Sequence, residues 1–213
     1  MFIELVDALR CPVVHEDSWL VATAARTEAR HIVEGTLGCP VCKAQFPIHD
    51  GVADLRRGHH QLVSVRSDAS GDDAPLRLAA FLGLDDAQGT VLLLGEWAAH
   101  ARGLRELVDV NVLAADPADG MAGEPGISVL RCDGPLPLAP GIARGTALDD
   151  TDGATRIASA VRATREGGRV VGPVGVPVPS GVRELARDER VWVAERERDL
   201  PLVSLASRGR AGT

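Results

Sequence analysis

The chain has 213 residues, of which 45% are apolar, and a formal net charge of −7 that results from 23 basic and 30 acidic residues. These values are typical of a globular protein with one large or two small domains. They argue against general nucleic-acid binding, and neither a membrane-spanning run of ~20 apolar residues nor a signal peptide is recognisable. We therefore expect a cytoplasmic protein that does not bind membranes.

The first 55 residues contain three of the four cysteines. Cys39 and Cys42 form a CxxC pair, a spacing that lets two thiolates converge on one tetrahedral metal ion. Upstream, Cys11 begins a matching motif, but Val14 stands where the second cysteine would be and His15 follows it. The predicted zinc ligands are Cys11, His15, Cys39 and Cys42.

The sequence also allows other interpretations of these cysteines. His31 and His49 are weaker substitutes for the fourth ligand. Alternatively, the cysteines are small buried apolar residues in a ribbon that needs no metal. A redox CxxC motif of the thioredoxin type is less consistent with the sequence, because that motif opens a helix and residues 43–48 have an extended pattern.

Three stretches of this segment, residues 5–12, 38–42 and 45–55, carry a family resemblance. Together they resemble the small zinc-ribbon family that activates tRNA, ribosomal-RNA and release-factor methyltransferases. The family ends on an aromatic residue followed by Pro-Ile-x-Asp-Gly-Ile-Pro, and residues 46–53 follow that pattern except that Ala53 replaces the last proline. The resemblance implies a β-rich ribbon that has no reaction of its own and covers the apolar edge of a methyltransferase sheet.

The remaining chain divides into a linker, a second domain and a tail. Residues 56–73 are polar and rich in small residues, which is typical of a linker, with a short strand predicted at 61–66. We expect a second domain at 74–207 and a disordered tail at 208–213.

The second domain alternates apolar runs with helical stretches, which predicts an α/β fold with a parallel, doubly wound sheet. The expected strands are 90–94, 110–114, 127–131 and 169–172. The expected helices are 97–108 and 152–165, the latter capped by Thr151 or Asp152 and stopped by Gly167 and Gly168. A terminal antiparallel hairpin is expected from 190–194 and 201–205.

The order of motifs in this domain resembles that of class I S-adenosylmethionine-dependent methyltransferases. Residues 91–95 resemble the first strand and its first glycine, and residues 132–138 and 166–171 resemble the segments around the later strands. The resemblance implies that Gly95, Asp116 and Asp133 would line the cofactor site if S-adenosylmethionine binds.

The first loop departs from that pattern. A cofactor-binding GxGxG turn uses glycines so that the backbone can pass close to the ligand. Here Gly95 is followed by Glu96, and Trp97 and Ala99 occupy the positions of the second and third glycines. Because an indole fills space and Glu96 adds negative charge, we expect that cofactor binding has been lost.

Other catalytic interpretations have little support. The sequence contains neither a GxSxG nor a GxxxxGK motif. His100 is a candidate base and residues 149–152 are a candidate acidic site, but the sequence favours a surface or packing histidine and a solvated loop with a helix cap.

Two hypotheses follow from the sequence. The first is a non-catalytic scaffold or regulatory protein that pairs an activator ribbon with a methyltransferase-like domain and acts through a protein partner or self-association. The second is an active S-adenosylmethionine-dependent methyltransferase that carries its activator in cis.

Overall fold

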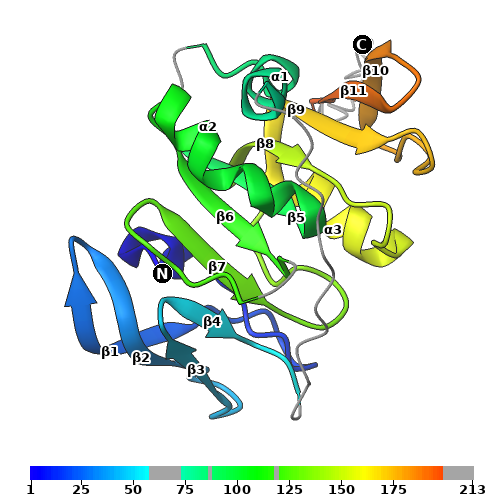
Figure 1. Cartoon of the computed structure of the whole chain (residues 1–213). Helices are drawn as coiled ribbons and strands as arrows, with labels where there is room; N and C mark the ends of the chain where they lie inside the picture. The colour runs from blue at the N-terminus through cyan, green and yellow to red at the C-terminus, as the bar shows by residue number, and fades with distance from the viewer. Residues whose placement is uncertain (58–72, 86–87, 118–119, 199–213) are drawn as a thin grey trace, which may run out of the picture.

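The structure is a computed structural model that describes residues 1–57, 73–85, 88–117 and 120–198 (Figure 1). Its strands form one eleven-stranded sheet in the order β1-β2-β3-β4-β7-β6-β5-β8-β9-β11-β10. We call residues 1–55 the ribbon and residues 74–196 the Rossmann-like region. The sheet is continuous across both, so the chain is organised around a single sheet.

The ribbon is an antiparallel meander that follows a short 3-10 helix. Its elements are η1 (Ile3–Ala8), β1 (Val21–Glu28), β2 (His31–Gly38), β3 (Gln45–His49) and β4 (Val52–Asp54). The turn from β3 to β4 needs left-handed backbone, and Asp50 and Gly51 supply it with φ values of 49° and 72°. Asn, Asp and Gly tolerate this conformation best, which explains why the chain makes a tight turn at these two residues.

The Rossmann-like region contains a parallel sheet core of five strands. Their order, β7-β6-β5-β8-β9, is the 3-2-1-4-5 order of a doubly wound fold. The elements are α1 (Ala74–Leu82), β5 (Thr90–Leu94), η2 (Gly95–His100), α2 (Ala101–Leu107), β6 (Asn111–Ala115), β7 (Ile127–Arg131), β8 (Ala143–Ala147), α3 (Ala154–Ala163), β9 (Thr164–Pro173), β10 (Val182–Arg187) and β11 (Val191–Arg196).

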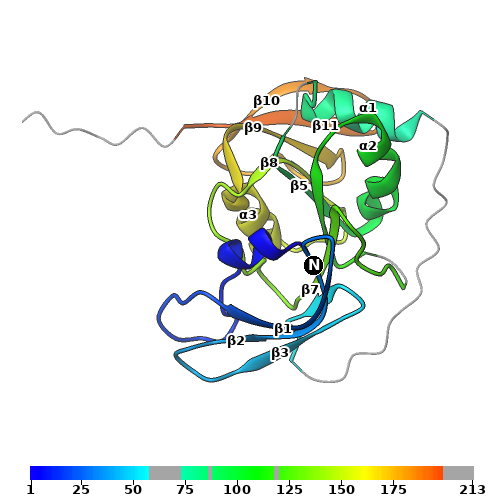
Figure 2. The same ribbon diagram turned by 90° about the vertical axis from the view of Figure 1, so that its left-hand side faces the viewer.

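Helices cover both faces of this parallel core (Figure 2). Along β5 the side chains alternate between two cores, with Val91 and Leu93 in the cluster that includes residues of α1 and α2, and Leu92 and Leu94 in the cluster that includes residues of α3. All four side chains are fully buried, as expected of a central parallel strand. None of the helices in the described part of the chain has the length and apolarity needed to span a lipid bilayer.

The ribbon joins the Rossmann-like region through a parallel pairing of β4 with β7. Ala53 pairs with Leu130 and is fully buried, and the N–H of Leu55 donates to the carbonyl of Arg131 at 2.7 Å. Figure 1 shows β4 beside β7 at the edge of the parallel core. The edge that β7 would otherwise expose is therefore covered by the same chain.

The predicted fold class is confirmed: a Rossmann-like α/β sheet with a terminal antiparallel hairpin follows a small β-rich segment. The predicted composition of that hairpin is wrong, because β11 pairs with β10, which precedes it, and with β9. Residues 201–205, like the predicted strand at 61–66 and the tail at 208–213, lie outside the described residues.

Two predicted helix boundaries are also wrong. The N-cap of α3 is Gly153 and makes no side-chain cap bond, so neither Thr151 nor Asp152 caps the helix. The helix ends at Ala163, and the Gly167-Gly168 pair lies inside β9. Thr164 starts that strand directly after the helix, which leaves no room for a glycine stop.

Candidate functional site

Four side chains of the ribbon converge at one point, where the β2–β3 turn meets the loop before β1. They are the predicted set Cys11, His15, Cys39 and Cys42, whose ligand atoms all lie within 4.8 Å of one another. The turn after β2 is closed by two backbone bonds between Cys39 and residues 43–44. Lys43 has a φ of 64°, which reverses the chain so that Cys39 and Cys42 face the same point.

The distances within this group match a tetrahedral zinc site. Cys11 Sγ and Cys42 Sγ are 3.7 Å apart, and Cys39 Sγ lies 3.4 Å from His15 Nε2. Two thiolates that share a tetrahedral zinc ion at about 2.3 Å each are roughly 3.8 Å apart. The donor set of three sulfurs and one imidazole is one that structural zinc sites use. The residues therefore fit a zinc ion.

The surroundings of the four ligands favour metal binding in two further ways. The backbone N–H of Cys42 donates to Cys39 Sγ at 3.5 Å. Burial alone would raise the pKa of the Cys39 thiol, but the N–H groups of Cys42 and Val41 outweigh it and lower that pKa. His15 Nδ1 contacts the carbonyl of Glu16, a contact that directs Nε2 towards the sulfurs.

The residues around this group clarify the role of the interrupted motif. Val14 occupies the position of the missing cysteine, and its side chain is 95% exposed. The two substitute histidines lie elsewhere: His49 Nδ1 contacts Glu34 at 3.0 Å, and His31 is buried against the α-amino group of Met1. His15 is thus the histidine that the fold brings to the three cysteines.

A second candidate site is the switch point of the parallel sheet, at the carboxyl ends of β5 and β8. In a doubly wound sheet, ligands bind at this switch point, where the connections after neighbouring strands leave in opposite directions. Here η2 and α2 follow β5, and α3 follows β8. The segment Gly95–Trp97 and the segment 148–152 therefore lie on the two sides of this switch point.

Two hydrogen bonds join these sides. The indole N–H of Trp97 donates to the carbonyl of Leu148 at 2.8 Å, and the backbone N–H of Glu96 donates to Asp149 Oδ2 at 2.7 Å. The Trp97 ring also packs against the core cluster formed with α1 and α2. Trp97 thus lies across the switch point and links the two sides.

The Asp149 carboxylate occupies the space beside Gly95. A Cβ atom on Gly95, whose φ is 52°, would lie 2.0 Å from Asp149 Oδ2. Asp149 is 4% exposed, and it also accepts from the N–H and hydroxyl of Thr151. Burial would raise the pKa of Asp149, but the N–H groups of Thr151 and Glu96 outweigh it and lower that pKa, so the carboxylate stays charged. Because Gly95 has no Cβ atom, the Asp149 carboxylate can lie directly against it.

Asp116, one of the three residues that the methyltransferase resemblance places at the cofactor site, forms an ion pair with Arg156 of α3. The Arg156 guanidinium contacts Asp116 Oδ2 and pairs with Asp152 Oδ1 at 2.9 Å. It also donates to the carbonyls of Cys132 and Gly134 at 3.2 and 3.1 Å. Burial raises the pKa of Asp152 even though Arg156 is adjacent. Arg156 therefore forms ion pairs with Asp116, which follows β6, and with Asp152, which follows β8.

The remaining predicted residues are placed nearby. Asp133 is exposed and accepts from the backbone N–H of Arg57 at 3.1 Å, at the seam with the ribbon. His100 is half-buried and lies edge-on to Trp97 with ring centroids 6.1 Å apart, and burial lowers its pKa. Gly95, Asp116 and Asp133 therefore follow three neighbouring strands of the parallel core, β5, β6 and β7.

Sequence reasoning missed Arg156 and the specific role of Asp149. Arg156 lies 40 residues from Asp116 and 4 residues from Asp152. The i,i+4 spacing to Asp152 was a readable signal of a helical ion pair. The contact with Asp116 had no such local signal, since it depends on the order of the strands.

Residues 3–51 match the Trm112p-like protein family. No curated protein sequence matches the chain. A solved complex between the Haloferax volcanii Trm112 methyltransferase activator and a putative methyltransferase is similar at 18% identity over 47% of this chain and 51% of that chain, with a TM-score of 0.38.

Two further solved structures are methyltransferases. The antibiotic-resistance methyltransferase Kmr is 15% identical over 62% of this chain and 96% of its own, with a TM-score of 0.40. The MycE methyltransferase from the mycinamycin biosynthetic pathway is 15% identical over 58% of this chain and 46% of its own, with a TM-score of 0.43. The chain thus combines a Trm112p-like segment with a region whose strand order is that of a doubly wound fold.

Proposed function

We propose that the protein is a non-catalytic scaffold or regulatory protein in which a Trm112-like ribbon covers the edge of its own methyltransferase-like sheet. The observation that carries this proposal is the pair of hydrogen bonds from Trp97 and Glu96 to Leu148 and Asp149. They hold protein groups across the crevice at which a doubly wound sheet normally binds its ligand.

The ion pairs of Arg156 support the same conclusion. A ribose-binding carboxylate has to present free oxygens to the ligand hydroxyls. Asp116 instead accepts from Arg156 and from the N–H of Cys132. Its partner Arg156 is held in turn by Asp152. Cofactor binding would have to break this network, at a cost of several hydrogen bonds to charged groups.

In this proposal the ribbon has a structural role. Its strand β4 pairs with β7, so the edge that a separate activator would cover is already occupied in cis. A zinc ion held by Cys11, His15, Cys39 and Cys42 would fix the loop and the turn that flank the ribbon strands. The surfaces that remain, on the ribbon and around the sheet, are available for a protein partner.

Calorimetric titration of the full chain with S-adenosylmethionine and with S-adenosylhomocysteine tests the proposal. We expect no heat of binding from protein whose cooperative unfolding shows that it is folded. Binding at micromolar concentration would overturn the proposal and favour an active methyltransferase that carries its activator in cis.

A further inference from the structure

Two cysteines of the ribbon are in contact although they are 31 residues apart in the chain. Cys11 Sγ and Cys42 Sγ are separated by 3.7 Å. Cys42 is exposed and Cys11 is half-buried, whereas Cys39 is only 3% exposed. The contact therefore joins the loop before β1 to the turn after β2, and one of its two sulfurs is open to reagents.

We propose that Cys11 and Cys42 form a redox switch that closes a disulfide and releases the metal ion when a peroxide is present. The Cys42 sulfur attacks a peroxide oxygen, so that the O–O bond breaks, one water leaves and a sulfenic acid forms. The Cys11 sulfur then attacks the Cys42 sulfur, the S–O bond breaks and a second water leaves. In the zinc-loaded chain both sulfurs are thiolates, so they give two electrons to hydrogen peroxide, and two protons from the solvent complete the two waters.

The positions of the other two ligands select this pair. Cys39 Sγ accepts from the backbone N–H of Cys42 at 3.5 Å and faces His15 Nε2 at 3.4 Å, so it is held within the turn. Cys11 comes from a different loop and approaches Cys42 sulfur to sulfur. After oxidation only Cys39 and His15 remain as ligands, which is too few for a closed zinc site.

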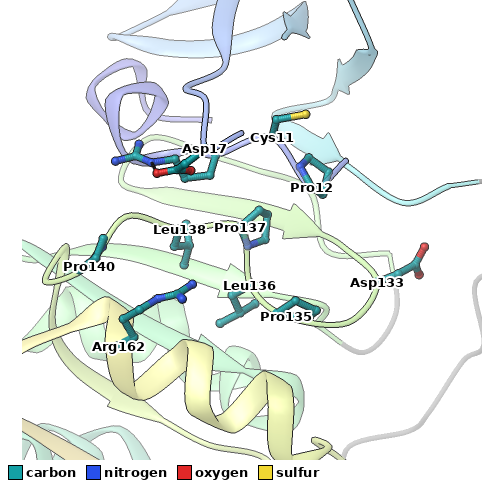
Figure 3. Close-up of a pocket in the computed structure, with 11 residues that line it drawn as sticks. Cys11, Pro12, Asp17, Asp133, Pro135, Leu136, Pro137, Leu138, Pro140 and Arg162 are labelled. Atoms are coloured by element: carbon teal, nitrogen blue, oxygen red, sulfur yellow. Dashed lines mark ion pairs between the residues drawn. The ribbon is translucent and has the colours of Figure 1, made fainter. Parts of the chain in front are cut away.

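The switch lies at the seam between the ribbon and the Rossmann-like region. Arg10, next to Cys11, makes a contact across this seam, since its N–H donates to the carbonyl of Pro137 at 2.8 Å. Arg57 links the other neighbour indirectly: its guanidinium donates to the carbonyl of Pro12 at 3.2 Å, and its backbone N–H donates to Asp133 at 3.1 Å. A cavity of about 340 Å³ separates the two sides. Figure 3 shows Cys11 and Pro12 on one side of it and Pro135 and Pro137 on the other. Disulfide formation at Cys11 would therefore weaken the contacts across this seam.

The test uses the full chain loaded with one equivalent of zinc and treated with hydrogen peroxide. We expect release of one zinc ion per chain to a chromophoric chelator, and a peptide map in which Cys11 is linked to Cys42. Dithiothreitol should reverse the link. Faster hydrogen exchange at the Arg10 amide, with unchanged exchange in β5, should accompany oxidation. Cys132→Ser is the matched control, because Cys132 is buried outside the cluster.

A link between Cys39 and Cys42, or oxidation that forms no disulfide, would overturn the inference. So would an unchanged exchange rate at Arg10 in the oxidised chain. The inference rests on the proposed metal centre and not on the proposed loss of catalysis. Because the peptide map reports the cysteine pair directly, it tests the pair even in a chain that binds S-adenosylmethionine.

Discussion

The indole N–H of Trp97 donates a hydrogen bond of 2.8 Å to the backbone carbonyl of Leu148 and so joins η2 to the segment that follows β8. The bond spans the switch point of the doubly wound sheet. Trp97 is thus a structural link between the segments that follow two neighbouring strands.

Replacing Trp97 measures that link. Trp97→Phe keeps an aromatic ring but removes the donor, so we expect the free energy of unfolding to fall by about 1 kcal/mol. Urea unfolding followed by circular dichroism measures the change. Trp19→Phe is the control, because Trp19 is 55% exposed and its replacement should cost less than about 0.5 kcal/mol. Equal effects of the two substitutions would contradict the proposed link.

Arg156 neutralises two carboxylates, and its removal should be costly. In Arg156→Met, Asp116 and Asp152 lose their cation, and we expect a loss of about 2 to 3 kcal/mol at pH 7. The loss should shrink under acidic conditions, because the pKa of Asp152 is raised and the acid is then neutral. Arg162→Met, an exposed position on the same helix, is the control. Urea unfolding at several pH values measures the free energy of unfolding of both variants, and equal losses at pH 7 would contradict this role of Arg156.

His31 should make the stability depend on pH. Burial lowers the pKa of His31 to about 4 from its ordinary 6.5, with a smaller contribution from the α-amino group of Met1. Between these values the unfolded chain binds more protons than the folded one, so stability should fall as the pH drops from 6.5 to 4. The full effect is about 3 kcal/mol. Urea unfolding across this range should show a shallower pH dependence in His31→Gln, and an unchanged dependence would contradict the assignment.

The seam between β4 and β7 should be sensitive to a buried charge. Ala53 is fully buried opposite Leu130, so Ala53→Asp is expected to cost more than about 3 kcal/mol. Ala25→Asp places the same charge on an exposed position of β1 and should change little. Thermal unfolding of both variants measures the difference. If Ala53→Asp were as stable as the wild type, β4 would not lie against β7 in solution.

The metal site makes a prediction about which histidine binds. His15→Ala should lose zinc, as measured by elemental analysis of the purified chain, because it removes one of four ligands. His49→Ala, an exposed position beside Glu34, should keep one zinc per chain. The assignment fails if His49→Ala loses the metal or if His15→Ala retains it.

The sequence predicted those parts of the fold and the site that rest on local patterns. The CxxC pair, the Cys11 and His15 spacing and the Asp50-Gly51 turn are all short-range signals, and the structure contains each of them. The central strand β5 could also be predicted from the sequence, because a strand that is covered on both faces needs a continuous apolar run.

Other parts depend on tertiary structure and could not be read in the same way. Strand β10 consists mostly of exposed residues, half of them charged, so its sequence has no apolar run. Residues 201–205, which were predicted as the second strand of the hairpin because they are mostly apolar, lie outside the described residues. Gly167 and Gly168 resemble a helix stop, but the chain continues straight into β9. The contact of Arg156 with Asp116 arises only when the tertiary fold brings the first turn of α3 next to the end of β6.

The most direct test of the Trp97 link across the switch point is an NMR spectrum of the chain labelled with ¹⁵N at its three tryptophans. We expect the indole N–H of Trp97 to exchange slowly with solvent, as should that of fully buried Trp192, which donates to Val176 at 2.7 Å, while exposed Trp19 exchanges fast. Addition of millimolar S-adenosylhomocysteine should leave the Trp97 resonance in place. A saturable shift of that resonance, or rapid exchange in the free chain, would contradict the account.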